Sequence, residues 1–114
     1  MVEPKFIRVN RFKRTMKFPY ECGFTIFGNK TDILYKTREE LAKSLTIGDW
    51  IGSGCDTKEC DTQFGFKSLS DVAKAKKIAR QIVNKNNVNL GISTYKYTRE
   101  EGLKLYHLKE EDVK

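Results

Sequence analysis

The segment from Leu69 to about Lys85 constrains the fold of this chain more than any other stretch. Its apolar residues recur every three or four positions, the spacing that places side chains on one face of an α-helix. Ser68 or Ser70 can cap this helix, and Asp71 lies favourably at its positive end. Because one face is apolar, another part of the chain has to cover it. The apolar positions are Leu69, Val72, Ala75, Ala79, Ile82 and Val83, and Lys74, Lys77, Gln81 and Lys85 lie on the opposite side.

Several short segments have apolar residues at every second position, which predicts β-strands. The clearest is 20–27, where Cys22, Phe24 and Ile26 share one face. A turn cluster at 28–31 favours a hairpin between this strand and the next, because Gly and Asn tolerate positive φ. The predicted strands cover residues 6–12, 20–27, 32–36, 63–66, 88–97 and 103–108.

The stretch from Thr37 to Glu40 predicts the start of a short helix. The Thr37 hydroxyl can bind the Glu40 amide while the Glu40 side chain reaches back, as in a capping box. Gly48 ends this helix, and we expect Trp50 to be a core anchor beside it. The polar, Gly-containing stretch 52–62 has little to bury, so it predicts an exposed loop.

A similar stretch begins at Thr98, but Gly102 stands where the first helix has Leu41. A Gly inside a helix costs about 1 kcal/mol relative to Ala. We therefore prefer a hairpin loop that leads into a strand over 103–108, with a helix as the alternative. The charged residues 109–114 predict a frayed tail.

Together these elements predict one α+β domain over residues 1–108. The length of 114 residues is typical of a single domain, which can bury one core without disulfides or metals. We expect a single, mostly antiparallel sheet of about five or six strands, with one short and one long helix packed on one face.

The chain is basic, with 22 Lys and Arg residues against 15 Asp and Glu residues and a net charge of +7. Residues 1–17 carry net +5 and residues 70–87 carry net +4, whereas residues 37–66 carry net −3. Lys outnumbers Arg by 16 to 6, which suits loose attraction to polyanions better than sequence-specific readout. The candidate binding residues are Arg8, Arg11, Lys13, Arg14, Lys17, Lys74, Lys77 and Arg80.

Aromatic residues alternate with the basic residues of the amino-terminal region. Single-strand binders often place stacking rings among cations in this way, and Phe6, Phe12, Phe18 and Tyr20 are the candidates. We therefore expect a non-enzymatic binding module whose partner is nucleic acid, held largely without sequence specificity. The alternative is a small inhibitor or host-interaction protein that docks on an acidic protein surface.

No pattern of catalytic, metal or cofactor residues in the chain is specific. Cys55 and Cys60, with Cys22 and His107, could form a Cys₃His zinc site, but their spacing is at the loose edge of known patterns. Acidic residues in the 52–62 loop could hold magnesium, and a metal-dependent enzyme built on that loop is the second alternative. We assign no catalytic residue, no metal ligand and no cofactor.

The compartment is predicted from the cysteines and from the apolar content. Three cysteines are an odd number, so at least one thiol is free and a reducing cytoplasm is the simplest setting. No apolar run approaches the roughly 20 residues that a membrane span requires, so we expect no membrane partner. In this setting Cys55 and Cys60 are predicted to be reactive free thiols, whereas a disulfide between them is possible only in an oxidising setting.

Overall fold

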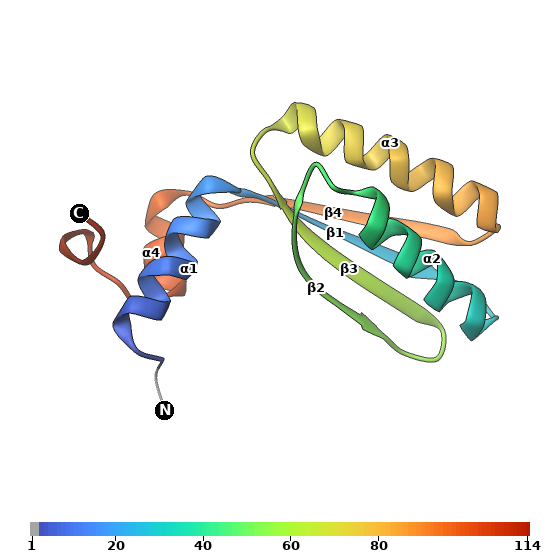
Figure 1. Ribbon diagram of the computed structural model, residues 1–114, viewed down its shortest axis with the longest axis horizontal. Helices are drawn as coiled ribbons and strands as arrows, with labels where there is room; N and C mark the ends of the chain where they lie inside the picture. The colour runs from blue at the N-terminus through green and yellow to red at the C-terminus, as the bar shows by residue number, and fades with distance from the viewer. Residues whose placement is uncertain (1–2) are drawn as a thin grey trace.

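The computed structural model describes residues 3–114. Within them lie four α-helices, one 3-10 helix and one antiparallel sheet of four strands (Figure 1). The order along the chain is α1 (Lys5–Lys17), β1 (Tyr20–Phe27), α2 (Thr31–Ser44), β2 (Asp49–Cys55), β3 (Glu59–Phe66), α3 (Leu69–Asn86), β4 (Asn89–Lys96), α4 (Arg99–Leu105) and η1 (Glu110–Val113).

The sheet has the strand order β2-β3-β1-β4, and every neighbouring pair is antiparallel. The succession β1-α2-β2-β3-α3-β4 in this order is the ferredoxin-like, split βαβ arrangement. Helices α2 and α3 lie on one face of the sheet, and α1 and α4 lie side by side beyond one end of it (Figure 1). The molecule is elongated and thin, with extents of 49 × 34 × 18 Å.

The core lies between the sheet and the pair α2 and α3. The predicted face of β1 is confirmed, because Cys22, Phe24 and Ile26 are all fully buried. The predicted α3 is also confirmed: the Ser68 hydroxyl accepts a hydrogen bond from the Asp71 amide at 3.1 Å. The buried residues of α3 are Val72, Ala75, Ala79, Ile82 and Val83. Leu69 was predicted on the same apolar face, but its side chain is 63% exposed.

The predicted strand over 32–36 and the helix start at Thr37 are wrong, because both belong to α2. Leu34 and Leu41 are buried one turn to either side of Thr37, at helical spacing. Thr37 is itself buried, donates its hydroxyl to the Ile33 oxygen at 2.7 Å and accepts from the Asn86 side chain at 2.9 Å. The capping-box pattern there marks a buried polar contact between α2 and α3.

The predicted strand over 6–12 is wrong as well, since these residues form α1. Phe12 is buried against α4, next to Gly102. Its neighbours one turn away, Val9 and Met16, are half-buried, so the relevant period is that of a helix. The apparent alternation of residues 6–12 is therefore a coincidence of composition.

The segment 98–108 contains the helix α4 (Arg99–Leu105), which was the alternative, and the preferred hairpin is wrong. Thr98 and Glu101 make a complete capping box. Gly102 is buried, and a Cβ there would lie 2.8 Å from Met16 Cε and 3.1 Å from the Phe12 ring. The glycine that argued against a helix is thus the point where α1 packs closely on α4.

The predicted 52–62 loop is a β-hairpin formed by β2 and β3. The strand predicted over 63–66 begins earlier, at Glu59, while the strand predicted over 88–97 is confirmed as β4. Trp50 is not a core anchor: it is 51% exposed, and its indole N–H donates to Ser53 Oγ at 3.0 Å. The sheet therefore has four strands instead of five or six.

The predicted tail, 109–114, contains η1. Lys5 Nζ lies 2.5 Å from Asp112 Oδ1, and Arg99 bonds Glu110 at 2.6 Å, so ion pairs connect η1 to α1 and α4. None of the helices within residues 3–114 combines the length and the apolar character needed to cross a bilayer.

Candidate partner-binding site

Arg8, the first predicted binding residue, connects α1 to the end of α4. Its Nη1 donates to the backbone oxygens of Tyr106 at 3.0 Å and His107 at 2.7 Å, and its Nε donates to the Glu3 oxygen at 3.0 Å. His107, predicted on a strand, is exposed in the turn after α4 with φ of 54°. Arg8 therefore satisfies backbone acceptors of its own chain.

Arg11 and Arg14 are paired with acidic side chains. Arg11 Nη1 lies 2.7 Å from Glu3 Oε1. Arg14 Nη2 donates to Asp49 Oδ1 at 2.6 Å, and its Nε donates to the other oxygen of the same carboxylate. This bidentate pair joins α1 to the start of β2 and raises the pKa of Arg14. All three arginines of α1 thus hold the helix in place.

The other two predicted residues of α1, Lys13 and Lys17, are exposed, and neither has an acidic partner within residues 3–114. Lys17 Nζ lies 5.6 Å from the centroid of the Phe18 ring, and Lys67 Nζ lies at the same distance. Phe12, a predicted stacking ring, is only 2% exposed and cannot stack on a base.

In contrast, the predicted residues of α3 are available to a partner. Lys74, Lys77 and Arg80 are all exposed, and none of them forms an ion pair within residues 3–114. They recur every three positions, so they follow the outer surface of the helix over two turns. Because α1 lies beyond the end of the sheet and α3 on its face, the two basic regions lie on different parts of the molecule (Figure 1).

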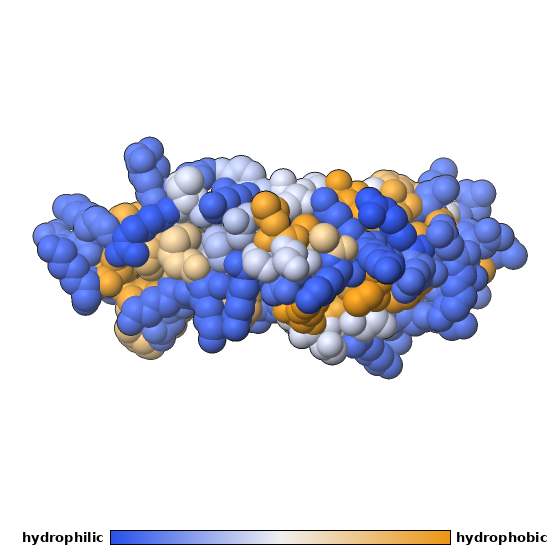
Figure 2. All heavy atoms as spheres, turned by 90° about the horizontal axis from the view of Figure 1, so that it is seen from above, coloured by the Kyte–Doolittle hydropathy of each residue, from blue (hydrophilic) through white to orange (hydrophobic). Residues whose placement is uncertain are grey.

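Two shallow grooves with apolar floors run along the flanks of α3. Between α3 and the end of α2, a groove of about 350 Å³ has Ile47 and Ile78 in its floor and Lys74 and Lys77 at its rim. Between α3 and β4, a groove of about 490 Å³ is lined by apolar side chains, with Arg80 and Asn84 at the rim; the apolar residues are Val83, Val88, Leu90 and Ile92. Figure 2, seen from the α3 side, shows small hydrophobic patches separated by hydrophilic surface.

The opposite face of the sheet carries acidic groups. By strand register, Glu21 of β1 and Glu59 and Asp61 of β3 point away from the helices, and no basic residue of the four strands shares that face. The net charge of −3 over residues 37–66 thus lies partly on the open sheet face. The molecule is polarised across its thickness, with the basic helix α3 on one side and the acidic groups of the open sheet face on the other.

A further cavity, of about 500 Å³, lies where α1 and α4 meet the open sheet face. Several polar groups of this cavity already bond to one another. Arg14 is paired with Asp49, and the Thr15 hydroxyl lies 2.8 Å from the Tyr106 hydroxyl. Burial, and then the Glu21 carboxylate, raise the pKa of Tyr97 to about 12. These contacts hold the α1–α4 pair against the sheet.

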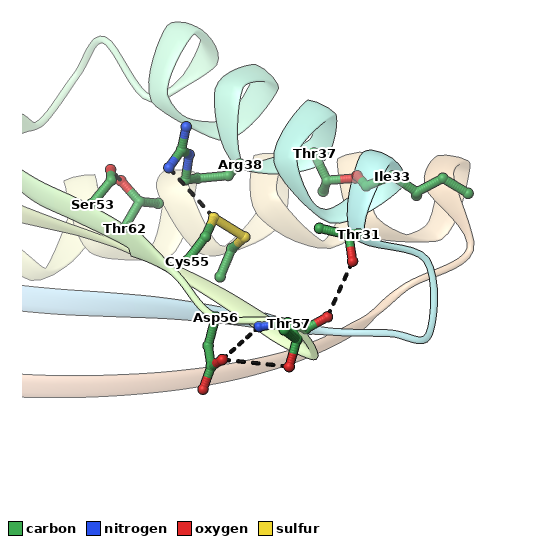
Figure 3. The surroundings of a disulfide bond; sticks show 10 residues. Thr31, Ile33, Thr37, Arg38, Ser53, Cys55, Asp56, Thr57 and Thr62 are labelled. Carbon is green, nitrogen blue, oxygen red and sulfur yellow. Dashed lines mark hydrogen bonds between the residues drawn. A yellow bond between two sulfur atoms is a disulfide. The ribbon is translucent and has the colours of Figure 1, made fainter.

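Cys55 and Cys60 form a disulfide that joins facing residues of β2 and β3 (Figure 3). Arg38 of α2 points toward it and donates to Cys55 Sγ at 3.4 Å. The prediction of two reactive free thiols is therefore wrong, because the register of the hairpin places the two side chains opposite one another. The remaining thiol, Cys22, is fully buried, and burial raises its pKa.

No cluster of three or more His, Cys, Asp or Glu side chains within residues 3–114 is arranged to hold a metal ion. Asp56, Glu59 and Asp61 of the predicted 52–62 loop line one shallow pocket of about 360 Å³ beside the turn between β2 and β3. The second alternative, a metal-dependent enzyme built on this segment, stays a prediction.

Sequence reasoning missed the apolar floors beside α3, because they combine residues from segments far apart in the chain. It also missed Lys76, which stands one helical turn before Arg80 and therefore on the same, β4-facing side of α3. The i, i+4 spacing of Lys76 and Arg80 could have revealed this second basic edge.

No protein-family model matches this chain, and no curated protein is detectably similar to it.

Proposed function

We propose that this protein is a non-enzymatic binding module that docks on an acidic protein partner through the outer surface of α3. The observation that carries the proposal is the set of three exposed cations, Lys74, Lys77 and Arg80, without acidic partners within residues 3–114 and bordered by grooves with apolar floors. Apolar pockets beside cations suit a partner that offers both carboxylates and aliphatic side chains.

The second candidate partner is single-stranded nucleic acid, held through its phosphates. The same three cations favour it, since phosphate contacts need only accessible positive charge. Against it stands the burial of Phe12, together with the lack of any aromatic residue in the groove linings beside α3. Nucleic acid on the outer surface of α3 would therefore be held without base stacking, whereas Phe6 of α1 is 68% exposed.

Two fluorescent probes distinguish these partners: an acidic peptide with interspersed aliphatic residues, and a single-stranded oligonucleotide. Anisotropy is measured with the native chain, with Lys74→Glu/Lys77→Glu, and with the matched control Lys13→Glu/Lys17→Glu. We expect the peptide to bind the native chain and the control equally, and the α3 variant at least about tenfold more weakly, which is a loss of about 1.4 kcal/mol.

Binding of the oligonucleotide alone would favour the second candidate. Its log affinity should then fall with log salt by about 0.7 per phosphate contact. Equal effects of the two double variants would overturn the assignment of the site to α3, and binding of neither probe would overturn both candidates.

A further inference from the structure

The outer edge of β4 is a row of unpaired backbone groups. Among residues 3–114, β1 is the only strand that pairs with β4. The Tyr97 amide donates to the Pro19 oxygen at 2.8 Å, and antiparallel pairs alternate between bonded and non-bonded. Odd-numbered residues of β4 therefore bond to β1. The N–H and C=O groups of Leu90, Ile92, Thr94 and Lys96 point outward.

From Asn89 to Tyr95 this edge has none of the features by which proteins usually protect a sheet edge. Natural edge strands are short, charged, bulged or interrupted by Pro. The other edge strand, β2, shifts register between Trp50 and Gly52, which marks a bulge or irregularity. In contrast, β4 is eight residues long, pairs regularly with β1, and has no Pro and no charge before Lys96. Its outer edge is therefore suited to pairing with another strand.

The groove between α3 and β4 runs beside this edge. Leu90 and Ile92 belong to the helix-facing side of β4, yet both are only half-buried because no further strand lies beside them. Arg80 borders the groove. Lys76 stands four residues earlier in the same helix, at the spacing that places both side chains on one side of α3. No acidic residue lines the groove.

We propose that β4 receives an extended segment of an acidic partner as a fifth strand. The segment pairs its backbone with the outward groups of β4, places aliphatic side chains beside Leu90 and Ile92, and places carboxylates beside Lys76 and Arg80. Strand addition of this kind takes affinity from main-chain hydrogen bonds and specificity from alternate side chains. The inference rests on the proposed function and names how that partner is held.

Charge decides between such a partner and a second copy of this chain. A two-fold pairing of β4 with β4 of another copy would bring two sets of Lys76 and Arg80 next to one another. The groove holds no carboxylate to offset them, and like charges across an interface favour other partners. The occupant is therefore an acidic, aliphatic strand.

The test uses two labelled heptapeptides, Val-Thr-Val-Thr-Glu-Thr-Glu and its reverse, which place Val and Glu on one side of a strand in either direction. Thr94→Pro removes one outward N–H and is tolerated at an edge, and the matched control Thr94→Val keeps the N–H and the branched shape. We expect one peptide to bind the native chain and Thr94→Val alike, and Thr94→Pro about tenfold more weakly.

A second variant, Lys76→Glu/Arg80→Glu, should bind the same peptide more weakly and should bind its analogue with Lys in place of Glu more tightly. If Thr94→Pro does not fold, amide exchange of the native chain replaces it: the Ile92 and Thr94 amides should become protected when the peptide binds. The peptide could instead lose binding to Lys76→Glu/Arg80→Glu while it binds Thr94→Pro as tightly as the native chain, or while the Ile92 and Thr94 amides stay unprotected. Either result would overturn strand addition but leave the proposed function standing. Binding of neither heptapeptide would overturn this inference, while the α3 probes test the function itself.

Discussion

Helices α1 and α3 carry similar excesses of positive charge, yet the structure uses those charges differently. In α1, Arg8, Arg11 and Arg14 bond carbonyls and carboxylates of the same chain. In α3, Lys74 and Lys77 extend into solvent beside an apolar groove. A guanidinium forms several directed hydrogen bonds at once, whereas an ammonium is a hydrated point charge.

The number of charges on a helix therefore does not identify a binding surface. The charges of α1 contribute to holding the α1–α4 pair on the sheet, and those of α3 remain available to a partner. Four measurements test this difference between α1 and α3.

The largest change in the free energy of unfolding is expected for a substitution on the buried face of α3, compared with one on its exposed face. Replacing Ile82 by Asp puts an unpaired carboxylate in the core, which should lower the free energy of unfolding by more than about 3 kcal/mol. Replacing the exposed Lys77 by Asp should change it by no more than about 0.5 kcal/mol. Chemical denaturation followed by circular dichroism measures both, and equal midpoints for the two variants would contradict the phase of α3 in the structure.

Next comes the contact between α1 and α4. Replacing Gly102 by Val forces side-chain atoms into the space held by Met16 and Phe12, and overpacking of this kind costs about 1–3 kcal/mol. The loss should be confined to α1 and α4, so their amides should exchange faster while those of α3 stay protected. Gly52→Ala is the control, because no atom lies within 4 Å of the added Cβ.

A smaller effect compares the two kinds of cation directly. Arg8→Ala leaves the Tyr106 and His107 oxygens without their donor and should cost about 1 kcal/mol. Lys74→Ala should cost no more than about 0.5 kcal/mol. The two free energies of unfolding are compared at low and high salt. A larger loss for Lys74 than for Arg8 would reverse the roles assigned to the two helices.

The smallest effect concerns Tyr97, at the junction of the α1–α4 pair and the sheet. Burial and the Glu21 carboxylate raise its pKa from 10.0 to about 12. Between these values the unfolded chain releases the phenolic proton and the folded chain keeps it, so this residue makes the free energy of unfolding fall as the pH rises. Tyr97→Phe should remove that part of the pH dependence. An ultraviolet titration in which all tyrosines ionise together would contradict the raised pKa.

The secondary structure could be predicted from the sequence alone where the spacing of apolar residues allows one interpretation. The segment of α3 has helical spacing over more than four turns and a serine cap, and β1 alternates cleanly, so both were predicted correctly. In each case, a single face is buried against a large core, and local spacing then reports the secondary structure directly.

Where the local pattern is ambiguous, the secondary structure depends on packing against distant parts of the chain. The first residues alternate well enough for a strand, but burial of Phe12 on Gly102 makes them a helix. The facing positions of Cys55 and Cys60 depend on the register of two strands, and the availability of each cation depends on distant acceptors. The physical reason is the same throughout: packing partners far apart in the chain contribute more free energy than the weak local preferences they override.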